Sequence, residues 1–406
     1  SPSLGATGFT ASPPAAGTAP TAPYSYTILQ TLSGIYTVGT TGTYTTLTAA
    51  VTAYNNNCLG GPVTFALLDA SYGASETFPI TINANANASA TNTLTIKPSS
   101  GVTSAITGSL ASGALIRLNG ADYVTIDGSN NGSSSRDLTI TNSSLTAPTA
   151  ISLVSAGLGA GATNNTIKNV KINTGVATTA GYGIAIGGAP GAGGADNDNN
   201  QLINNKITDA TIGIFSSGTT AVTAGANDGL VVQTNDISTS TTSTLLVKGI
   251  QLVNTLGATV SGNQVSIETT NAGQPVGIAL EGGALNAVVT KNLVSKVLTT
   301  ATGGYGARGI AVATGSASSN VEISNNIVYG VNGSNYSAFS NSSSIGIGLG
   351  VSNSTITDAT GGVRVYYNTV RLSGDYTYAA NCITAALYVG SGATTLDIRN
   401  NIFASN

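Results

Sequence analysis

A short pattern of apolar residues around asparagine recurs along the chain, and it constrains the fold more than any other feature. It reads apolar-x-x-Asn-x-apolar, as in the segment ISNNIV at residues 323–328. The Asn positions of the complete copies are Asn205, Asn235, Asn263, Asn292, Asn326, Asn368 and Asn401. With degenerate copies at Ser143 and Val170, successive positions lie 27 to 42 residues apart. Such a spacing indicates a solenoid or a propeller, in which each repeat stacks on its neighbours.

A second pattern, small-apolar-x-apolar, alternates with the first and marks another short strand in each repeat. Clear copies are GIAI at residues 183–186 and GIAL at residues 277–280. Three short strands per repeat, with one on each side of the Asn turn, favour a right-handed parallel β-helix. A propeller blade needs four antiparallel strands joined by hairpins, and two-residue Asn-Gly or Asp-Gly turns do not recur here at fixed places.

The two patterns also predict what lies inside the helix. We expect the seven asparagines to stack as an interior ladder, because Asn tolerates left-handed backbone geometry and its amide can bond to the same amide one coil away. We expect the second pattern to form an aliphatic column. Its members are Ile184, Ile214, Ile250, Ile278, Ile310 and Ile347.

Composition and pattern divide the chain into three parts. Residues 1–33 are rich in Pro, Ala and Thr and are expected to form an extended arm. Residues 34–110 are expected to hold an N-terminal cap and the first coils, with a short helix in which Leu47, Ala50, Val51 and Tyr54 share one face. Residues 111–406 hold the regular coils. The predicted fold class is all-β: a right-handed parallel β-helix with a capping helix and an N-terminal arm.

The composition narrows the classes of partner and chemistry. Only 7% of the residues are charged and the net charge is −3, with no basic cluster, so we expect no nucleic-acid partner. No apolar run approaches the roughly 20 residues that cross a bilayer, so we expect no membrane insertion. His, Trp and Met are absent, which removes the commonest general base and the commonest metal ligand. We therefore expect no cofactor.

Several segments resemble the pectate-lyase-like, right-handed β-helix repeats of large secreted surface proteins of Bacteroidetes. These segments are GIYTVG at residues 34–39, YTTLTAA at 44–50, GPVTF at 61–65, DYVTIDG at 122–128 and NNTIKN at 164–169. The resemblance covers roughly residues 34–406. It implies the β-helix fold, an extracellular or cell-surface location, and a role like that of adhesins or envelope components.

Acidic residues are the first place to look for catalysis. Polysaccharide-cleaving enzymes on this fold gather carboxylates on one outward strip, often with Ca²⁺. The 16 acids of this chain are scattered along the sequence, so no catalytic residue is predicted. One dense patch, DNDNN at residues 196–200, makes Asp196 and Asp198 weak candidates for a cation site. Its composition favours a solvated turn rich in Asx hydrogen bonds instead.

One charged strip is expected near the C-terminal end. Glu322, Arg364 and Asp397 each stand four residues before a ladder Asn, so they are expected to stack at about 4.8 Å in three consecutive coils. Alternating charge is what a cross-strand salt ladder needs, and we prefer that interpretation to a catalytic strip. Arg399 and Tyr366 flank the strip and leave a binding surface as the alternative.

These observations predict an extracellular structural protein that is not an enzyme. It is expected to be the subunit of a cell-surface fibre or an adhesin, assembled head to tail through the β-helix ends and the N-terminal arm. The alternative is a carbohydrate-binding or polysaccharide-degrading β-helix protein with a glycan as its partner.

The two cysteines bear on the expected assembly. Cys58 and Cys382 are expected to lie about 40 Å apart, at least eight coil rises, which is too far for a disulfide within one chain. They can pair only between molecules. Two free thiols are the other possibility.

Overall fold

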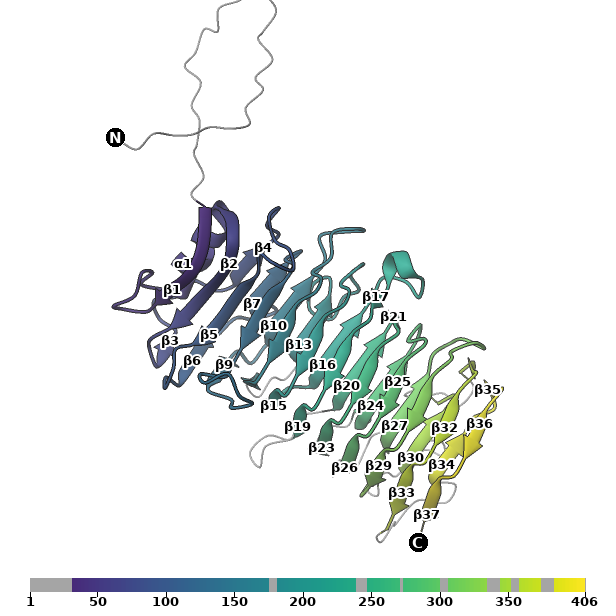
Figure 1. Ribbon diagram of the computed structural model, residues 1–406. Coiled ribbons are helices and arrows are strands. Elements are labelled where there is room, and N and C mark those ends of the chain that lie inside the picture. The colour runs from purple at the N-terminus through teal and green to yellow at the C-terminus, as the bar shows by residue number, and fades with distance from the viewer. Residues whose placement is uncertain are drawn as a thin grey trace, which may run out of the picture.

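The computed structural model is a parallel β-solenoid of about 10 turns, with its strands stacked from the N-terminal to the C-terminal end (Figure 1). The structure describes residues 31–174, 181–238, 247–270, 273–299, 306–333, 344–351, 358–373 and 383–405. Most of the expected Pro-rich arm lies outside these residues. The prediction of an all-β parallel β-helix is confirmed.

Each full coil contributes one strand to each of three parallel sheets, named A, B and C in the order in which the chain enters them. Sheet A consists of β1 Thr31–Val38, β2 Cys58–Leu67, β5 Leu94–Pro98, β8 Val124–Asp127, β11 Thr166–Lys168, β14 Gln201–Ile203, β18 Val231–Gln233, β22 Thr259–Ser261, β25 Val288–Thr290, β28 Glu322–Ser324, β32 Arg364–Tyr366 and β36 Asp397–Arg399. Sheet B consists of β3 Ser71–Tyr72, β6 Ser104–Gly108, β9 Leu138–Asn142, β12 Val170–Asn173, β15 Lys206–Thr208, β19 Asp236–Ser238, β23 Gln264–Thr269, β26 Leu293–Thr299, β29 Ile327–Tyr329, β33 Thr369–Leu372 and β37 Ile402–Ser405. Sheet C consists of β4 Ile80–Asn83, β7 Ala114–Asn119, β10 Thr149–Val154, β13 Tyr182–Gly187, β16 Ile212–Ser217, β20 Lys248–Val253, β24 Val276–Glu281, β27 Ala307–Ala313, β30 Ser344–Leu349 and β34 Thr384–Val389. Two short ladders complete the strands, β17 Asn227–Asp228 with β21 Thr255–Leu256 and β31 Thr360–Gly361 with β35 Ala393–Thr394.

The core is filled by the apolar positions of the two repeat patterns. In sheet A, for example, Val260, Val289 and Ile323 pair in register and are fully buried. In sheet C the aliphatic column is continuous and fully buried. It runs through Ile184, Ile214, Ile250, Ile278, Ile310 and Ile347. Strands in register lie about 4.8 Å apart, so a repeated position in the sequence becomes a column in the core.

In the Asn turn between sheets A and B, one residue takes the left-handed backbone conformation and the next supplies the buried side-chain amide. The residue before each ladder Asn is the one that takes left-handed backbone geometry, as at Asn204, Thr234 and Lys291, where φ lies between 52° and 57°. The ladder Asn itself contributes its side-chain amide. The expectation that the ladder Asn supplies the left-handed corner is therefore wrong by one position. Asn recurs in the sequence pattern because of its side-chain amide, which few other side chains can replace.

The N-terminal end carries a helix where sheet C would otherwise begin. Helix α1, Leu47–Asn56, starts at the N-cap Thr46, whose hydroxyl accepts a hydrogen bond from the Ala49 amide, and it buries the four expected apolar residues. Its Asn55 amide donates to the Thr81 carbonyl of β4 and accepts from the Asn83 amide. One side chain thus imitates the backbone of a neighbouring parallel strand, so α1 satisfies part of the edge of β4.

The only other helix among the described residues is the 3₁₀ turn η1, Thr223–Gly225. Within the same part of the chain, no helix has the length and apolar character that crossing a bilayer requires.

One degenerate repeat is out of register with the sequence pattern. The position that pairs with Val170 in sheet B is Leu138, not Ser143. The segment 128–137 is inserted between β8 and β9 in this coil. A pattern applied at constant spacing therefore selects Ser143, which lies just after β9. Leu145, two residues after Ser143, takes the last apolar position of that copy in the sequence pattern, yet it is 62% exposed.

Candidate functional site

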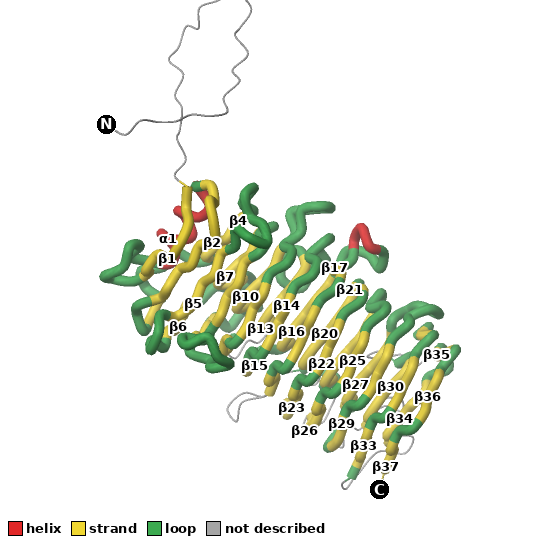
Figure 2. The backbone as a smooth tube through the Cα atoms, in the orientation of Figure 1, coloured by secondary structure: helices red, strands yellow, loops and turns green. Residues whose placement is uncertain are grey.

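A groove of about 880 Å³ lies at the corner where the chain passes from sheet C to sheet A. The loops of five successive coils line it, from Asn83 at the end of β4 to Ala224 in η1. Figure 2 shows these loops and η1 along one edge of the solenoid. Small residues such as Gly120, Gly159 and Gly161 keep the floor open, and the polar lining includes Asp122, Asp196 and Asp198. Those lining residues come from distant parts of the sequence that the coils bring together.

Two of the lining carboxylates belong to one column. The residues three positions before Thr125, Thr166, Gln201 and Val231 occupy one register, because these four pair in sheet A. The column so formed is Asp122, Thr163, Asp198 and Asp228.

Hydrogen bonds join the neighbours in this column. Asp122 Oδ1 accepts from the Thr163 amide at 2.8 Å and from its hydroxyl at 2.6 Å. Asp198 Oδ1 accepts from the Asp228 amide at 2.7 Å. These contacts fix each carboxylate relative to the next coil, so the column is set by the solenoid backbone.

The environment raises the pKa of two carboxyl groups in this column, Asp198 and Asp228. Burial raises the pKa of Asp198 above its ordinary value, and the Asp196 carboxylate adds to this, while the hydrogen bond from the Asp228 amide opposes it. Burial also raises the pKa of Asp228, and the charges of Asp198 and Asp196 raise it further. Asp228 Oδ1 is buried and accepts no hydrogen bond from the described residues. One proton is therefore held more tightly here than on an ordinary aspartate.

The DNDNN patch separates into core and surface residues. Asn197 and Asn200 are fully buried and form a second amide ladder: Asn197 Nδ2 donates to Asn227 Oδ1, and Asn165 N donates to Asn200 Oδ1. Asp196 and Asp198 face the groove. Asp196 accepts a hydrogen bond from the Gly159 amide. The described residues hold no set of three His, Cys, Asp or Glu side chains placed to bind a metal ion.

The charged strip near the C-terminal end has a different character. Glu322, Arg364 and Asp397 pair in register, and Arg364 Nε lies 3.7 Å from Glu322 Oε2. Asp397, however, pairs with Arg399 of its own strand and accepts a hydrogen bond from the Tyr366 hydroxyl at 2.6 Å. These contacts hold the pKa of Asp397 below its usual range, chiefly through Arg399. A carboxylate with a lowered pKa is a poor proton donor, so the strip carries a surface ion-pair network.

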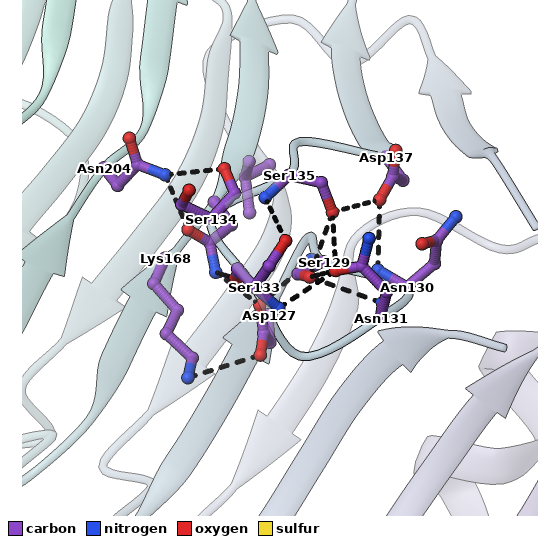
Figure 3. Close-up of polar contacts among 12 residues, drawn as sticks. Asp127, Ser129, Asn130, Asn131, Ser133, Ser134, Ser135, Asp137, Lys168 and Asn204 are labelled. Atoms are coloured by element: carbon purple, nitrogen blue, oxygen red, sulfur yellow. Dashed lines mark hydrogen bonds and ion pairs between the residues drawn. The ribbon is translucent and has the colours of Figure 1, made fainter. Parts of the chain in front are cut away.

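Figure 3 shows a third polar cluster, around the inserted segment 128–137. Asp127 lies 3.3 Å from Lys168 Nζ and accepts a hydrogen bond from Asn169. Arg136 reaches across one coil and donates to the carbonyl and the side-chain oxygen of Asn204 at 2.8 and 2.7 Å. Hydrogen bonds within the cluster also lower the pKa of Asp137, first through Ser135. The cluster fastens the insertion to the corner of sheets A and B.

The structure describes only one of the two cysteines that were expected to pair between molecules. Cys58 begins β2 as a free thiol of intermediate exposure. Cys382 lies outside the described residues. Intermolecular pairing of the two stays a prediction.

Comparisons with known proteins reveal similarity in structure alone. No family model matches the sequence, and neither does any curated protein. The Dettilon tailspike protein matches with a TM-score of 0.52 at 15% identity, over 87% of this chain and 58% of that one. XylC in complex with xylose matches with a TM-score of 0.54 at 11% identity, over 87% and 71%. The enzymatically active domain of tailspike protein 2 from bacteriophage CBA120 matches with a TM-score of 0.44 at 13% identity, over 79% and 39%.

These matches establish the β-helix fold, and they contradict the expected function. The structures that share the fold include a complex with xylose, so the prediction of a non-enzymatic fibre or adhesin subunit is corrected. The alternative, a carbohydrate-binding or polysaccharide-degrading protein, agrees better with these structures. Counting acids along the chain does not show which of them the coils bring together. Asp122 and Asp198 are distant in sequence, yet the coils place them in one column.

Proposed function

We propose that this protein cleaves a polysaccharide in the groove between sheets C and A. The observation that carries the proposal is the pair Asp122 and Asp198, which stand in one column of an open groove. XylC, whose structure shares the fold, is described in complex with xylose, which supports a carbohydrate as the ligand. The chain spans 58% of the Dettilon tailspike protein, so nothing of that protein's activity is assumed here.

The spacing of the pair favours one stereochemical course. Two coil rises separate Asp122 and Asp198, or roughly 9 to 10 Å between their backbone positions. Glycosidases that invert the anomeric carbon hold their two carboxyl groups about 6.5–9.5 Å apart, which leaves room for a water molecule, whereas retaining enzymes hold them at about 5 Å. The column therefore fits a direct attack by water with inversion.

The environment assigns the two roles. Asp198 has the raised pKa and keeps its proton to higher pH, so it is the general acid that protonates the leaving oxygen. Asp122, held by the two hydrogen bonds from Thr163, is the general base that takes a proton from water. Asp196 and Asp228 do not need to touch the reacting atoms. The charge of Asp196 raises the pKa of Asp198 and so helps to hold its proton, whereas the hydrogen bond from the Asp228 amide opposes this.

Substitution of the pair tests the proposal. Against a panel of neutral and acidic polysaccharides, we expect release of reducing ends by the unaltered protein and a loss of about 10² to 10⁴ in rate for Asp198→Asn and for Asp122→Asn. Asp236→Asn is the matched control, because Asp236 lies on sheet B and pairs with Lys206. Proton NMR of the first product should show an inverted anomer.

The pH profile supplies a second readout. Because the acid must be protonated, activity should fall as pH rises through the raised pKa of Asp198. Cleavage that survives both substitutions would refute the assignment, and glycan binding without any cleavage would reduce the protein to a binding module.

The setting of this activity is part of the proposal. We place the cleavage outside the cell or at its surface. The sequence resemblance to secreted surface proteins of Bacteroidetes agrees with that location. A fractionation experiment with an antibody to this chain would test it.

A further inference from the structure

The charged residues that line the groove all have the same sign. Three acidic side chains line the groove, Asp122, Asp196 and Asp198, and no Lys or Arg is among its lining residues. A concave surface with apolar walls concentrates the field of such charges and repels ligands of the same sign. A polymer with one carboxylate on every sugar would meet this repulsion along its whole length.

A second hollow continues the groove. It measures about 420 Å³ and shares Ala156 and Leu158 with the first, so the loop that carries Leu158 separates the two. Its lining contains Gly188, Gly193 and Thr219 and no charged residue. Leu158 is 71% exposed between the two hollows, where a solvated side chain would be expected. The two hollows form one trough, acidic on one side of Leu158 and uncharged on the other.

We propose that the trough takes a neutral glycan of several sugar units, which passes over Leu158 from one hollow to the other, and that it excludes polyuronates. The inference rests on the proposed function for the location of the site. It adds the charge class of the substrate and the extent of the chain that is bound. An uncharged sugar chain suits both hollows, because hydroxyl groups donate hydrogen bonds to carboxylates and sugar faces cover apolar side chains such as Leu158.

Calorimetric binding separates this inference from the question of cleavage. Every protein in the experiment carries Asp198→Asn, so that no substrate is consumed. The probes are xylohexaose, cellohexaose and maltohexaose on the neutral side, and hexagalacturonate and hexamannuronate on the acidic side. We expect at least one neutral probe to bind at least tenfold more tightly than either uronate at low salt.

Two further substitutions probe the charge and the length of the trough. Adding Asp196→Asn should improve uronate affinity by about fivefold, the worth of one unit charge at contact distance in water, whereas adding the control Asp236→Asn should not. Adding Leu158→Asp should weaken binding of the neutral hexasaccharide tenfold or more and leave the corresponding disaccharide unaffected. Leu158 is exposed, so this change should not disturb folding.

The outcomes distinguish the two proposals. Neutral binding by a protein that never cleaves would refute the proposed function and leave this inference standing. Uronate binding as tight as neutral binding, or no binding of any hexasaccharide, would overturn the inference. Equal loss of hexasaccharide and disaccharide binding in the Leu158 variant would show that the second hollow takes no part.

Discussion

At the scale of the residue, the ladder asparagines form the hydrogen bonds that join successive coils at one corner of the solenoid. Each ladder Asn before Asn401 donates to a carbonyl of the preceding coil and to the amide oxygen of the next Asn, as Asn263 does to Val232 and Asn292. Its own amide oxygen accepts from the preceding coil, as Asn263 does from Asn235. These groups are buried, where an unpaired amide or carbonyl costs about 1–3 kcal/mol. The ladder therefore turns a corner without leaving backbone groups unsatisfied.

The middle of the ladder supplies a test. Asn292→Leu removes the acceptor for Asn263 and the donor to the Val260 carbonyl, so unfolding should become easier by about 1–3 kcal/mol or more. Chemical denaturation with a fluorescence or circular dichroism readout measures this. Asn87→Leu is the control, because Asn87 is exposed, and it should stay within about 0.5 kcal/mol of the unaltered protein. Equal stability of the two variants would mean that the ladder bonds contribute nothing net.

Residues of one type were not equally predictable from sequence. The seven ladder asparagines stand between apolar residues at fixed distances, so periodicity finds them. Asn197 and Asn200 are as buried as the ladder asparagines. They stand in a run of polar residues, however, and no flanking apolar pattern indicates that their side chains point inward. The acidic column escaped for a related reason. Asp198 and Asp228 each stand seven residues before a ladder Asn, but the coil of Asp122 has no ladder Asn, so the sequence pattern gives no point from which to count.

At the scale of the element, the small residue near the start of most strands of sheet C explains how closely the coils pack. A Cβ atom added at Gly277 would lie 2.6 Å from the Gly309 carbonyl oxygen of the next coil and 2.4 Å from Val294 of sheet B. The same two kinds of neighbour crowd the equivalent glycines of the other coils. Those glycines are Gly183, Gly213, Gly249, Gly309 and Gly346. The small position in the sequence pattern is therefore set by backbone contact and not by turn geometry.

Enlarging this position should be costly. Gly277→Val forces the backbone of one coil away from the next, and overpacking of this kind destabilises by about 1–3 kcal/mol or more. Gly282→Ala is a fitting control, because a Cβ atom there meets nothing within 4 Å. Thermal unfolding of the two variants measures the difference. A Gly277 variant as stable as the control would show that the coils can separate slightly without cost.

At the scale of the whole molecule, the two ends of the solenoid are finished differently. At the N-terminal end, helix α1 packs against β4 and completes its hydrogen bonds through Asn55. At the other end, the three sheets finish at β34, β36 and β37, where Ile398 is 37% and Ile402 63% exposed. In a solenoid each coil is stabilised mainly by its two neighbours, so a coil with one neighbour has about half of that support. Within this chain, the coil of β34, β36 and β37 should therefore open before the coils at its centre.

Amide hydrogen exchange tests this asymmetry, because protection reports local opening along the chain. We expect the slowest exchange in the central strands such as β22 and β25, intermediate exchange in α1 and β2, and the fastest exchange in β36 and β37. The same experiment bears on the head-to-tail association expected from the sequence, which stays a prediction. A second copy seated on the open edge would pair the free amides of β36 and β37, so their exchange would slow as the protein concentration rises. Exchange that is uniform along the solenoid would contradict the asymmetry, and exchange at this edge that does not change with concentration would contradict the head-to-tail association.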